Sequence, residues 1–379
     1  MTTPQRLDIL HHFAHLHDPR DPRFLTHRLG DLLTIALCAV LSGADSFEDL
    51  AAFGRAKETW LRGLGLALPD GIPSHDTFRD LFRHLDPGTF QDCFTAWINA
   101  VWTRLGGRHV AIDGKALRGS RGLHGTCLHL VSAWVGANAL TLGQVAVEDK
   151  SNEITAIPKL LQLLELQGAL VSIDAIGCQK EIAQAIRATA ADYLLQVKGN
   201  QPTLQADIQA GFAAAFAADY VGFEHDLWVS EGRGHGRQEE RVCLVLYNLE
   251  RLRTRAEWVD LQAIVQITRT RWVGEQESFE VSHYISSRRG SAQELGSVAR
   301  DHWGIENGLH WVLDVVFRED NSHLKDRVAA ENLGMLRRAA VSLIRQDESK
   351  GSVSGKLRRA SWDDDFRLHL LKLLSEESA

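Results

Sequence analysis

The chain has 379 residues, of which 44% are hydrophobic and 24% charged, and its formal net charge is −7 at pH 7. These are the values of an ordinary soluble globular protein, long enough for two or three domains with a buried core. No apolar run reaches about 18 residues and no secretory leader is recognisable, so we expect a cytoplasmic protein without a membrane span. The five cysteines form no C-x-x-C pair, which argues against a zinc site or a disulfide framework. The negative charge does not exclude a nucleic-acid partner, because local patches decide phosphate binding.

Residues 1–105 have apolar residues at spacings of three and four, as in helices. The segment GIPSHDTFRDLFRHLDP starts with a capping serine, Ser74, and would leave Arg79 and Arg83 on the outside of its helix. Short helices in this arrangement are typical of a helix-turn-helix, and a bundle that packs on the next domain explains the pattern equally well. We expect a helical N-terminal DNA-binding region.

Between residues 106 and 216 the pattern changes to strands and then to alternating helices and strands. RHVAIDGKAL, CLHLVSAWVG and LTLGQVAVED are predicted to be three consecutive strands with tight turns. The helix NEITAIPKLLQLLELQ, the strand GALVSIDAIGCQ, the helix KEIAQAIRATAA, the strand DYLLQVKGNQ and the helix PTLQADIQAGFAAAFAA follow. Antiparallel strands followed by a β-α-β-α-β succession predict one mixed sheet with helices packed on it.

The remainder of the chain divides into three parts. Residues 217–288 are predicted to be a β-rich insertion, because HDLWVSEGRGHGRQEERVCLVLY, WVDLQAIVQITRTRWVG and ESFEVSHYISS are typical of strands with basic and aromatic content. Helices return in residues 289–345. Residues 346–379 are expected to be a polar, only partly ordered tail.

Two aspartates occupy equivalent places in the predicted sheet, Asp113 at the end of VAID and Asp174 at the end of VSID. A carboxylate at the carboxyl end of a buried strand faces the crevice where open α/β sheets bind ligands. Two such anions side by side are costly, and a divalent cation with oxygen ligands, Mg²⁺ or Mn²⁺, is the usual remedy. Either aspartate alone could simply cap the turn that follows it. The matched pair favours the metal site.

Several strings sharpen this interpretation: AIDGKALRGS, KSNEITAIPKLL, SIDAIGCQKEIA, YLLQVKGNQPTL, GHGRQEER and RDHWGIENGLHWVLDVVFRED. Together they resemble the H-repeat-associated insertion-sequence transposases, a branch of the cut-and-paste DDE group. The resemblance implies an α/β fold, an RNase H-like mixed sheet flanked by helices, with a helical N-terminal region and a β-rich insertion. Residues 106–216 and 289–345 would then be the two parts of the catalytic core. It also implies a catalytic and metal-binding triad of Asp113, Asp174 and Glu306.

Four acidic residues in HWGIENGLHWVLDVVFRED compete for the third place in that triad. Glu306 borders the apolar stripe that would face the sheet, near the start of the helix. Asp314 lies about 12 Å further along a helix axis and could not share a metal cluster with Glu306 unless the helix were broken. Glu319 and Asp320 follow the apolar run, so we expect them at a solvated helix end. We also expect the tryptophans of this helix to be buried.

Histidines flank Glu306 by one turn on either side. His302 and His310 are candidates for orienting Glu306 through hydrogen bonds or for touching DNA. The wider group often carries a Tyr-Arg-Glu-Lys signature around this glutamate. Here His302 stands at the arginine position and Leu313 at the lysine position. Contacts to the terminal phosphate are therefore expected from other basic residues.

Polar and basic residues near the predicted strand ends and loops are further candidates for DNA contact. They are Lys115, Arg118 and Arg121 after the first aspartate, Lys198 and Asn200 in VKGNQP, and His235 and Arg237 in GRGHGRQEER. Solvated basic turns and ordinary turn chemistry are the alternatives. Trp228 and Trp272 could stack on an unpaired base or pack in the β layer, and Arg337 and Arg338 could line DNA or simply be exposed.

The resemblance implies a transposase whose carboxylates hold two Mg²⁺ ions, or Mn²⁺, across a scissile phosphate. It would hydrolyse the ends of an insertion sequence and join the freed 3′-hydroxyls to target DNA. Its partners would be double-stranded DNA, as terminal inverted repeats and target, and a second copy of the chain in a homodimer that brings two ends together. It would be cytoplasmic and associated with the nucleoid when bound. The alternatives are a metal-dependent nuclease without strand transfer and a domesticated DNA-binding protein with a silent core.

Overall fold

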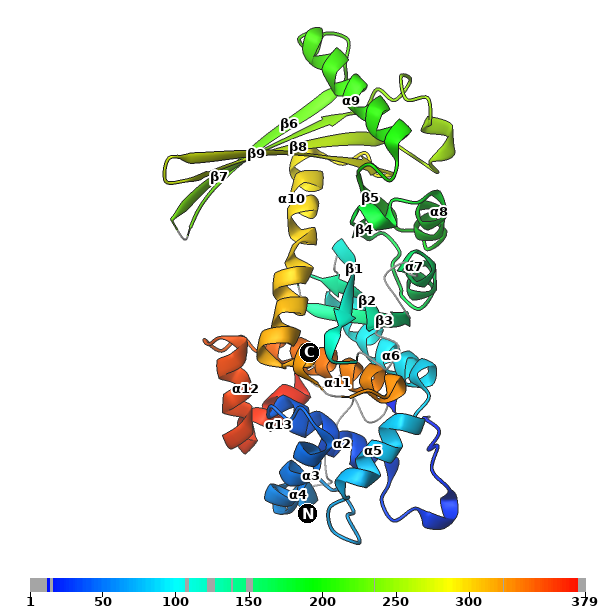
Figure 1. Ribbon diagram of the computed structural model, residues 1–379, viewed down its shortest axis with the longest axis vertical. Helices are drawn as coiled ribbons and strands as arrows, with labels where there is room; N and C mark the ends of the chain where they lie inside the picture. Colours follow the sequence, from blue (N-terminus) through cyan, green and yellow to red (C-terminus); the bar gives the residue numbers. More distant parts are fainter. Residues whose placement is uncertain are drawn as a thin grey trace. The chain divides into compact units, whose positions relative to one another are not determined.

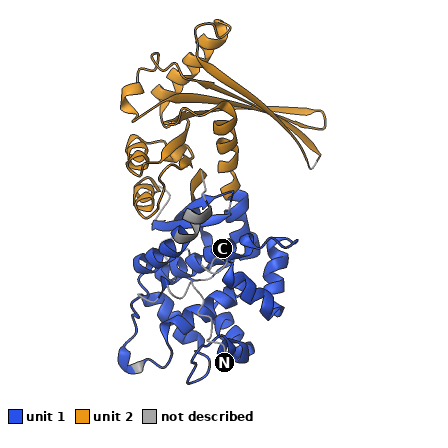
Figure 2. Ribbon diagram, turned by 180° about the vertical axis from the view of Figure 1, so that it is seen from behind, with its two compact units in different colours: residues 1–107, 114–152, 306–379 blue, residues 108–113, 153–305 orange. Residues whose placement is uncertain are grey.

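The chain forms two compact units in the computed structural model (Figure 2). The helical unit comprises Met1–Gly107, Gly114–Asn152 and Glu306–Ala379, and the sheet unit comprises Arg108–Asp113 and Glu153–Ile305. The residues that the structure describes are 12–13, 16–105, 109–120, 127–137, 139–147, 153–234, 236–322 and 324–373.

The helical unit begins with short helices whose starts are fixed by polar caps. Ser46 Oγ accepts a hydrogen bond from the backbone N–H of Asp49, and Ser74 Oγ accepts one from Thr77. Each serine thereby satisfies a backbone donor that the first helical turn leaves open, and the predicted cap at Ser74 is confirmed. The helices are α2 (Leu29–Leu41), α3 (Phe47–Ala56), α4 (Glu58–Gly63), α5 (His75–His84) and α6 (Pro87–Leu105).

Helix α11 (Arg327–Gln346) is the central element of the helical unit, and most of its residues are buried. It contacts α2, α5 and α6, and also α12 (Val353–Trp362) and α13 (Asp364–Lys372). The last two helices bury Leu357, Phe366 and Leu370. The expectation of a polar, only partly ordered tail after residue 346 is therefore wrong for residues 353–372. There the apolar residues recur at helical spacing and pack into the unit.

A β-hairpin in the helical unit follows the first strand of the chain. Strands β2 (Leu128–Val135) and β3 (Leu140–Val147) pair antiparallel, with a register shift at Ala133 and Trp134. Helices α6 and α11 contact β3. Strand β1 (His109–Leu117) runs through the boundary between the units, so its part up to Asp113 belongs to the sheet unit.

The sheet unit contains a mixed sheet with the strand order β1-β4-β5-β9-β8-β7-β6. Strands β1, β4 and β5 are parallel, and β9 pairs antiparallel with β5. Helix α8 joins β4 to β5, as the crossover between parallel neighbours requires. The strands are β4 (Leu170–Ile173), β5 (Asp192–Val197), β6 (His225–Gly234), β7 (Arg237–Leu246), β8 (Ala263–Val273) and β9 (Gln276–Ser286), and the helices are α7 (Glu153–Gln162), α8 (Lys180–Ala188), α9 (Pro202–Ala217) and α10 (Ala292–His302).

Three strands, then a helix, a strand, a helix, a strand and a helix follow one another along the chain. With β1, β4 and β5 parallel, this is the succession of an RNase H-like core. The predicted fold class is confirmed: an α/β fold with a mixed sheet flanked by helices, a helical N-terminal region and a β-rich insertion. The inserted strands β6–β9 extend the core sheet, because β9 is hydrogen-bonded to β5 (Figure 1).

Helix α10 packs closely on the antiparallel strands of the sheet unit. Leu295 and Val298 of this helix belong to a buried cluster that includes Cys243 of β7. A Cβ atom on Gly296 would lie 3.0 Å from Cβ of Cys243 and 3.1 Å from the ring of Trp228. The glycine therefore permits the close approach of the helix to β6 and β7.

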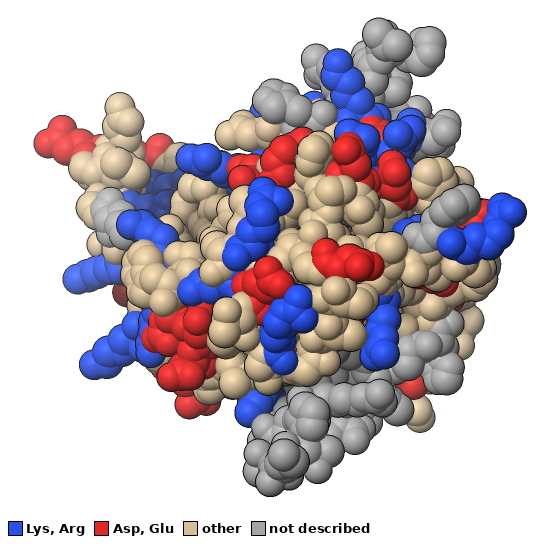
Figure 3. Space-filling model, turned by 90° about the horizontal axis from the view of Figure 1, so that it is seen from below, with Lys and Arg blue, Asp and Glu red and all other residues tan. Residues whose placement is uncertain are grey.

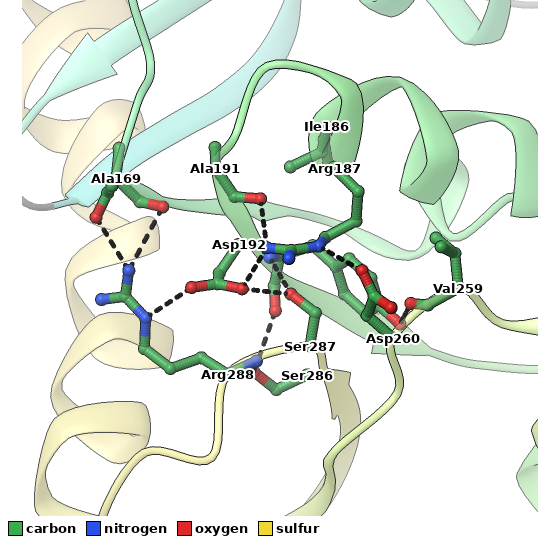
Figure 4. A network of polar contacts seen from close by, with 12 residues as sticks. Ala169, Ile186, Arg187, Ala191, Asp192, Val259, Asp260, Ser286, Ser287 and Arg288 are labelled. Carbon is green, nitrogen blue, oxygen red and sulfur yellow. Dashed lines mark hydrogen bonds and ion pairs between the residues drawn. The ribbon is translucent and has the colours of Figure 1, made fainter.

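A polar network fixes the start of β5 (Figure 4). Asp192 accepts hydrogen bonds from Arg288 Nε at 2.9 Å and from Ser287 Oγ at 2.8 Å, and it pairs with Arg187 at 2.5 Å. Arg288 also donates to the backbone carbonyl of Gly168 at 2.8 Å. The network joins α8, β5 and the segment after β9 at the amino end of the parallel strands. It supports the fold from the edge of the sheet opposite to the strand-end aspartates.

The surface of the helical unit mixes charges of both signs on the face seen from below in Figure 3. Arg79 pairs with Asp76 at 2.5 Å and Arg83 with Asp326 at 3.1 Å, and both arginines are about half exposed. The predicted DNA contacts of these two arginines stay a prediction, as does the N-terminal DNA-binding region. In the part of the chain that the structure describes, no helix has the length and apolar character needed to cross a membrane.

Candidate active site

Asp113 and Asp174 lie beside each other at the carboxyl ends of two paired segments. The register of β1 and β4 pairs Ile112 with Ile173, so the next residue on each strand is one of the two aspartates. Neighbouring parallel strands are about 4.8 Å apart, and equivalent positions point to the same face. Both aspartates are half-buried. One detail differs from the expectation: β1 continues to Leu117, so Asp113 directly follows the part of the strand that pairs with β4 and does not end the strand itself.

Asp174 also caps the turn that follows it. Its Oδ1 atom accepts a hydrogen bond from the backbone N–H of Ile176 at 3.1 Å. A Cβ atom on Gly177 would lie 2.2 Å from Cγ2 of Ile173, so the glycine lets this turn fold back against β4. The capping role is therefore present, and it occupies one carboxylate oxygen of an acid that also stands at a strand end.

The loop after β5 supports the same turn. Asn200 Nδ2 donates to the carbonyl oxygen of Ala175 at 2.6 Å, and Gln201 Nε2 donates to that of Cys178 at 2.9 Å. Asn200, a predicted DNA contact, therefore holds the turn next to Asp174. Lys198 is exposed on the same loop, and its contact with DNA stays a prediction.

A row of hydrogen bonds lies on the strand that carries Asp174. Ser172 Oγ is 2.7 Å from Nε2 of His109 and 2.9 Å from Nδ1 of His302. Burial lowers the pKa of His302 to about 4, although Asp174 opposes this, and burial lowers the pKa of His109 to about 3. With both rings neutral, the serine hydroxyl can donate to one ring nitrogen and accept from the other ring. Ser172 precedes Asp174 by two residues, so both point to the same face of the sheet.

The structure places His302 in the interior of the sheet unit, and its predicted roles, orienting Glu306 or touching DNA, stay predictions. The residue is 6% exposed, and its ring is engaged by Ser172. His310 is half-buried in the helical unit, and its predicted role stays a prediction. Leu313, which stands at the lysine position of the signature, is completely buried and has no means of contacting a phosphate.

Glu306 is exposed and begins a π-helical segment. The segment η6 (Glu306–His310) is followed by a second one, η7 (Val312–Val316), where an α-helix was expected. Hydrogen bonds from i to i+5 widen such a helix, and π-helical turns are frequent at functional sites. Glu306 belongs to the helical unit and the two aspartates to the sheet unit, so the convergence of the triad stays a prediction.

The burial of this segment agrees only in part with the expectation. Ile305, Leu309 and Val312 are buried, as the predicted apolar stripe requires. Trp303 and Trp311 are 40% and 54% exposed. The expectation of buried tryptophans is wrong here, because the buried stripe is filled by aliphatic side chains.

Lys115 lies in a buried ion cluster of the helical unit. Its side chain is 6% exposed, and Nζ lies 2.6 Å from Asp314 Oδ1, 3.3 Å from Glu319 Oε2 and 3.2 Å from Asp320 Oδ1. Glu319 also pairs at 2.9 Å with Arg338, and both of these side chains are completely buried. We call these five residues the lysine cluster. It ties strand β1 and helix α11 to the end of the π-helical segment.

The lysine cluster corrects several expectations. Burial would raise the pKa of Glu319, but Arg338 and Lys115 lower it to about 2, so the acid is ionised inside the protein. Burial acts to lower the pKa of Lys115, and the surrounding carboxylates raise it overall. Glu319 and Asp320 are therefore not a solvated helix end. The charge of Lys115 is neutralised by these acidic side chains, whereas the sequence suggests a DNA phosphate as its partner.

The remaining basic candidates differ in their surroundings. Arg118 is exposed, and its backbone N–H donates to Asp320 Oδ1 at 3.2 Å. Arg237 is exposed at the start of β7. Arg337 and Arg338 are buried, so neither lining DNA nor simple exposure describes them. The predicted contacts at Arg121 and His235 lie outside the described residues.

Sequence reasoning missed His109 and Ser172, which are hydrogen-bonded to each other on the two strands that lead to the aspartates. His109 precedes Asp113 by four residues and Ser172 precedes Asp174 by two, so each lies on the same face of its strand as the aspartate that follows it. The pairing of Ala111 with Ser172 places the two strands in this register. The period-two pattern of the strands could have found them, because it places polar side chains on the face of the aspartates. The missed partners of Lys115 had no comparable local signal.

The donor chemistry of the strand ends fits a divalent metal. Carboxylate oxygens on rigid elements are the ligands that Mg²⁺ and Mn²⁺ prefer. Asp113 and Asp174 supply two such groups at adjacent register positions. Across the described ranges, no group of three or more His, Cys, Asp and Glu residues is close enough to hold a metal ion.

Comparisons with known proteins find the following similarities. A family model described as "Transposase DDE domain" matches residues 104–343, and one described as "DDE_Tnp_1-associated" matches residues 10–98. The chain is 36% identical over 375 residues to YncI of Escherichia coli O157:H7, named as a candidate transposase, covering 97% of this chain and 95% of YncI. It is 33% identical over 371 residues to YhhI of Escherichia coli strain K12, named as an H-repeat-associated candidate transposase, covering 96% and 97%. A solved piggyBac transposase synaptic complex with hairpin DNA has a TM-score of 0.40 at 11% identity, over 95% of this chain and 74% of that chain, a likeness too weak to carry an argument.

Proposed function

The chain belongs to the transposase DDE domain family, and on that premise we propose that it cleaves DNA at the ends of an insertion sequence and transfers the freed strands to target DNA. Asp113, Asp174 and Glu306 are the carboxylates that we assign to the active centre. The substrates would be double-stranded DNA, first the terminal inverted repeats and then the target duplex.

The register of the parallel strands carries this proposal. Because Ile112 pairs with Ile173, the two aspartates stand at neighbouring positions on rigid, buried strands. An aspartate that only caps a turn has no reason to be matched by a second one across the register. The adjacent pair is what a cation between the carboxylates requires.

Two observations support Glu306 as the third acid. It follows His302 by four residues, and His302 is bonded to Ser172 on the strand of Asp174. Since a chain spans at most about 3.6 Å per residue, the Cα atom of Glu306 lies within about 14 Å of that of His302. The other acids of the segment are engaged by Lys115, whereas Glu306 is exposed.

The protein's contribution to the reaction is positioning and charge. Two bound Mg²⁺ ions, or Mn²⁺, would activate the attacking water or 3′-hydroxyl and stabilise the leaving oxygen. The capped turn and Asn200 restrain Asp174, and Ser172 holds the two histidines beneath it. Because burial keeps those histidines neutral, they add no positive charge that would compete with a cation for the carboxylates.

We assign the working form to a homodimer. Two ends of an element must be cut and joined together, and each copy of the chain carries one candidate centre. Mass measurement of the protein on paired DNA ends tests this point. One copy per pair of ends contradicts it.

The decisive experiment is cleavage in vitro of a DNA fragment that contains the chain's own gene with its flanking sequence. Glu306→Gln keeps the size of the side chain and removes its charge. We expect it to lower Mg²⁺-dependent cleavage by more than the roughly 10–100-fold that loss of an outer-shell partner costs. Glu348→Gln is the matched control, because Glu348 is an exposed acid of the same unit. Wild-type cleavage by Glu306→Gln contradicts the assignment.

The same preparation separates the alternative functions. Precut ends supplied with target DNA test strand transfer directly, and cleavage without any joining identifies a nuclease. A complete lack of Mg²⁺-dependent cleavage of cognate ends, with DNA binding retained, identifies a domesticated DNA-binding protein.

A further inference from the structure

Strands β7 and β8 of the sheet unit place several arginines on one face. Arg241 of β7 is directly opposite Arg269 of β8, and Glu239 is directly opposite Arg271. Side chains alternate between the two faces of a strand, so Arg237, two residues before Glu239, shares this face. The strings GRGHGRQEER and TRTRW, separate in the sequence, therefore contribute to one surface.

Helix α10 adds a further arginine to that surface. The helix packs on the same face, because Gly296 approaches Cys243, which alternation places on the side of Arg241. Arg300 lies one turn after Gly296 and is exposed, and its charge acts on Arg241. We call Arg237, Arg241, Arg269, Arg271 and Arg300 the arginine face.

Acidic residues neutralise only part of the arginine face. Glu239 pairs with Arg241 and, at 3.4 Å, with Arg271. Glu280 pairs with Arg269. Within the part of the chain that the structure describes, no ion pair involves Arg237 or Arg300. The arginines thus outnumber the acids that pair with them.

Gathering these cations costs free energy. Burial lowers the pKa of Arg241, Glu239 opposes this, and the positive charges of Arg300, Arg269 and Arg271 lower it further. Mutual repulsion of this kind works against the compact state. A surface that keeps this repulsion between its arginines is suited to binding a polyanion, because each arginine is attracted to the negative charges of the ligand.

We propose that the arginine face binds the phosphate backbone of double-stranded DNA, which deepens the proposed function and rests on it. The guanidinium fork pairs with phosphate oxygens through two hydrogen bonds. Same-face residues of a strand are about 7 Å apart. A duplex carries one negative charge per about 1.7 Å of its axis, so each arginine of a row finds a phosphate within reach.

The rest of the surface favours a duplex over a single strand. Strand β6 places only Ser230, Gly232 and Gly234 beside the arginines of β7, which leaves the face open to a broad ligand. Trp272 and the exposed Phe279 point to the opposite face, because they pair with residues that alternate with the arginines. Binders of single strands combine their cations with aromatic platforms for the bases. Here these two aromatic side chains are separated from the cations. Trp228 shares the face of Cys243, but its ring packs against Gly296 of α10.

The test measures DNA binding without cleavage, using the full chain in the presence of EDTA. A labelled duplex of unrelated sequence and its matching single strand are titrated by fluorescence anisotropy over a range of salt concentrations. The double variant Arg237→Gln/Arg300→Gln removes the two arginines that have no ion pair. We expect the slope of log affinity against log salt for the duplex to fall by about 1.8, at about 0.9 per phosphate contact. The matched control, Arg233→Gln, removes an exposed arginine of the same hairpin on the opposite face and should leave the slope unchanged.

The outcomes separate the two proposals. An unchanged slope in the double variant, or an equal change per charge in Arg233→Gln, overturns the arginine face as the DNA surface. Tighter binding of the single strand that depends on the same arginines overturns the duplex assignment. A wild type that binds duplex through this face yet never cleaves keeps the inference and removes the proposed function. If the wild type cleaves DNA but its duplex binding does not depend on these arginines, the proposed function stands and the inference about the arginine face is overturned.

Discussion

The lysine cluster and the arginine face both concentrate charged side chains, and they do so in opposite ways. Around Lys115, three carboxylates and two cations neutralise one another, with Lys115, Glu319 and Arg338 buried and Asp314 and Asp320 half-buried. On the arginine face the cations outnumber the acids that pair with them, and Arg237 and Arg300 are exposed. A buried charge is tolerated only when it is paired, whereas water tolerates an exposed surplus. The first arrangement is suited to holding elements together, and the second to meeting a ligand of opposite charge.

The largest expected effect on stability comes from unbalancing the charges of the lysine cluster. Glu319→Leu leaves Arg338 buried without its acid, and an uncompensated buried charge costs about 3–5 kcal/mol of stability. Urea unfolding of the full chain measures the loss. The double variant Glu319→Leu/Arg338→Met should recover part of it, because apolar residues of similar volume replace a buried pair at little cost. A double variant no more stable than Glu319→Leu shows that packing, and not charge, is what the cluster contributes.

A second test uses pH to separate the charges of the two units. The pKa of His302 is lowered from about 6.5 in the unfolded chain to about 4, so the folded state binds this proton more weakly. The contribution of His302 to the free energy of unfolding is therefore fully present above pH 6.5. It declines as the pH falls towards 4, by up to about 3 kcal/mol. The pKa of Glu319 is lowered from 4.5 to about 2, so its contribution declines only below pH 4.5.

The free energy of unfolding between pH 7 and 4.5 is the measurement that checks this separation. His302→Asn should make the decline shallower without removing it, because the buried His109, whose pKa is lowered to about 3, remains. The exposed control His84→Asn should retain the full decline. A decline that is equally steep in His302→Asn assigns the acid sensitivity to other groups.

Regular elements could be predicted because their signals are local. The strand pattern around VAID and VSID, together with the resemblance, led to Asp113 and Asp174, and the register then placed the two side by side. Ser74 was predicted as a cap because capping needs only the next few residues. The π-helical turn at Glu306 was missed, since i to i+5 bonding has no residue pattern as regular as that of an α-helix.

Partners of charged side chains could not be predicted, because they are distant in the sequence. Lys115 follows Asp113 closely and was interpreted as a phosphate contact, but its acids are about 200 residues further on. The reverse holds for Arg269 and Arg271, which gain their significance from Arg241 across the ladder. In both cases the sequence specifies the charge, and only the fold decides whether another side chain neutralises it.

The smallest expected effect on stability is that of removing a single cation from the arginine face. Arg300→Gln removes a cation that has no ion pair in the described ranges, so the free energy of unfolding should change by no more than about 0.5 kcal/mol. The change is small because relief of the repulsion with Arg241 is offset by loss of the attraction to Asp301, and added salt should reduce the difference between wild type and variant by screening both interactions. Thermal unfolding at low and high salt measures both effects. A loss of stability as large as that of Glu319→Leu would show that the arginine face stabilises the fold, as the lysine cluster does, and is not a free surface for DNA.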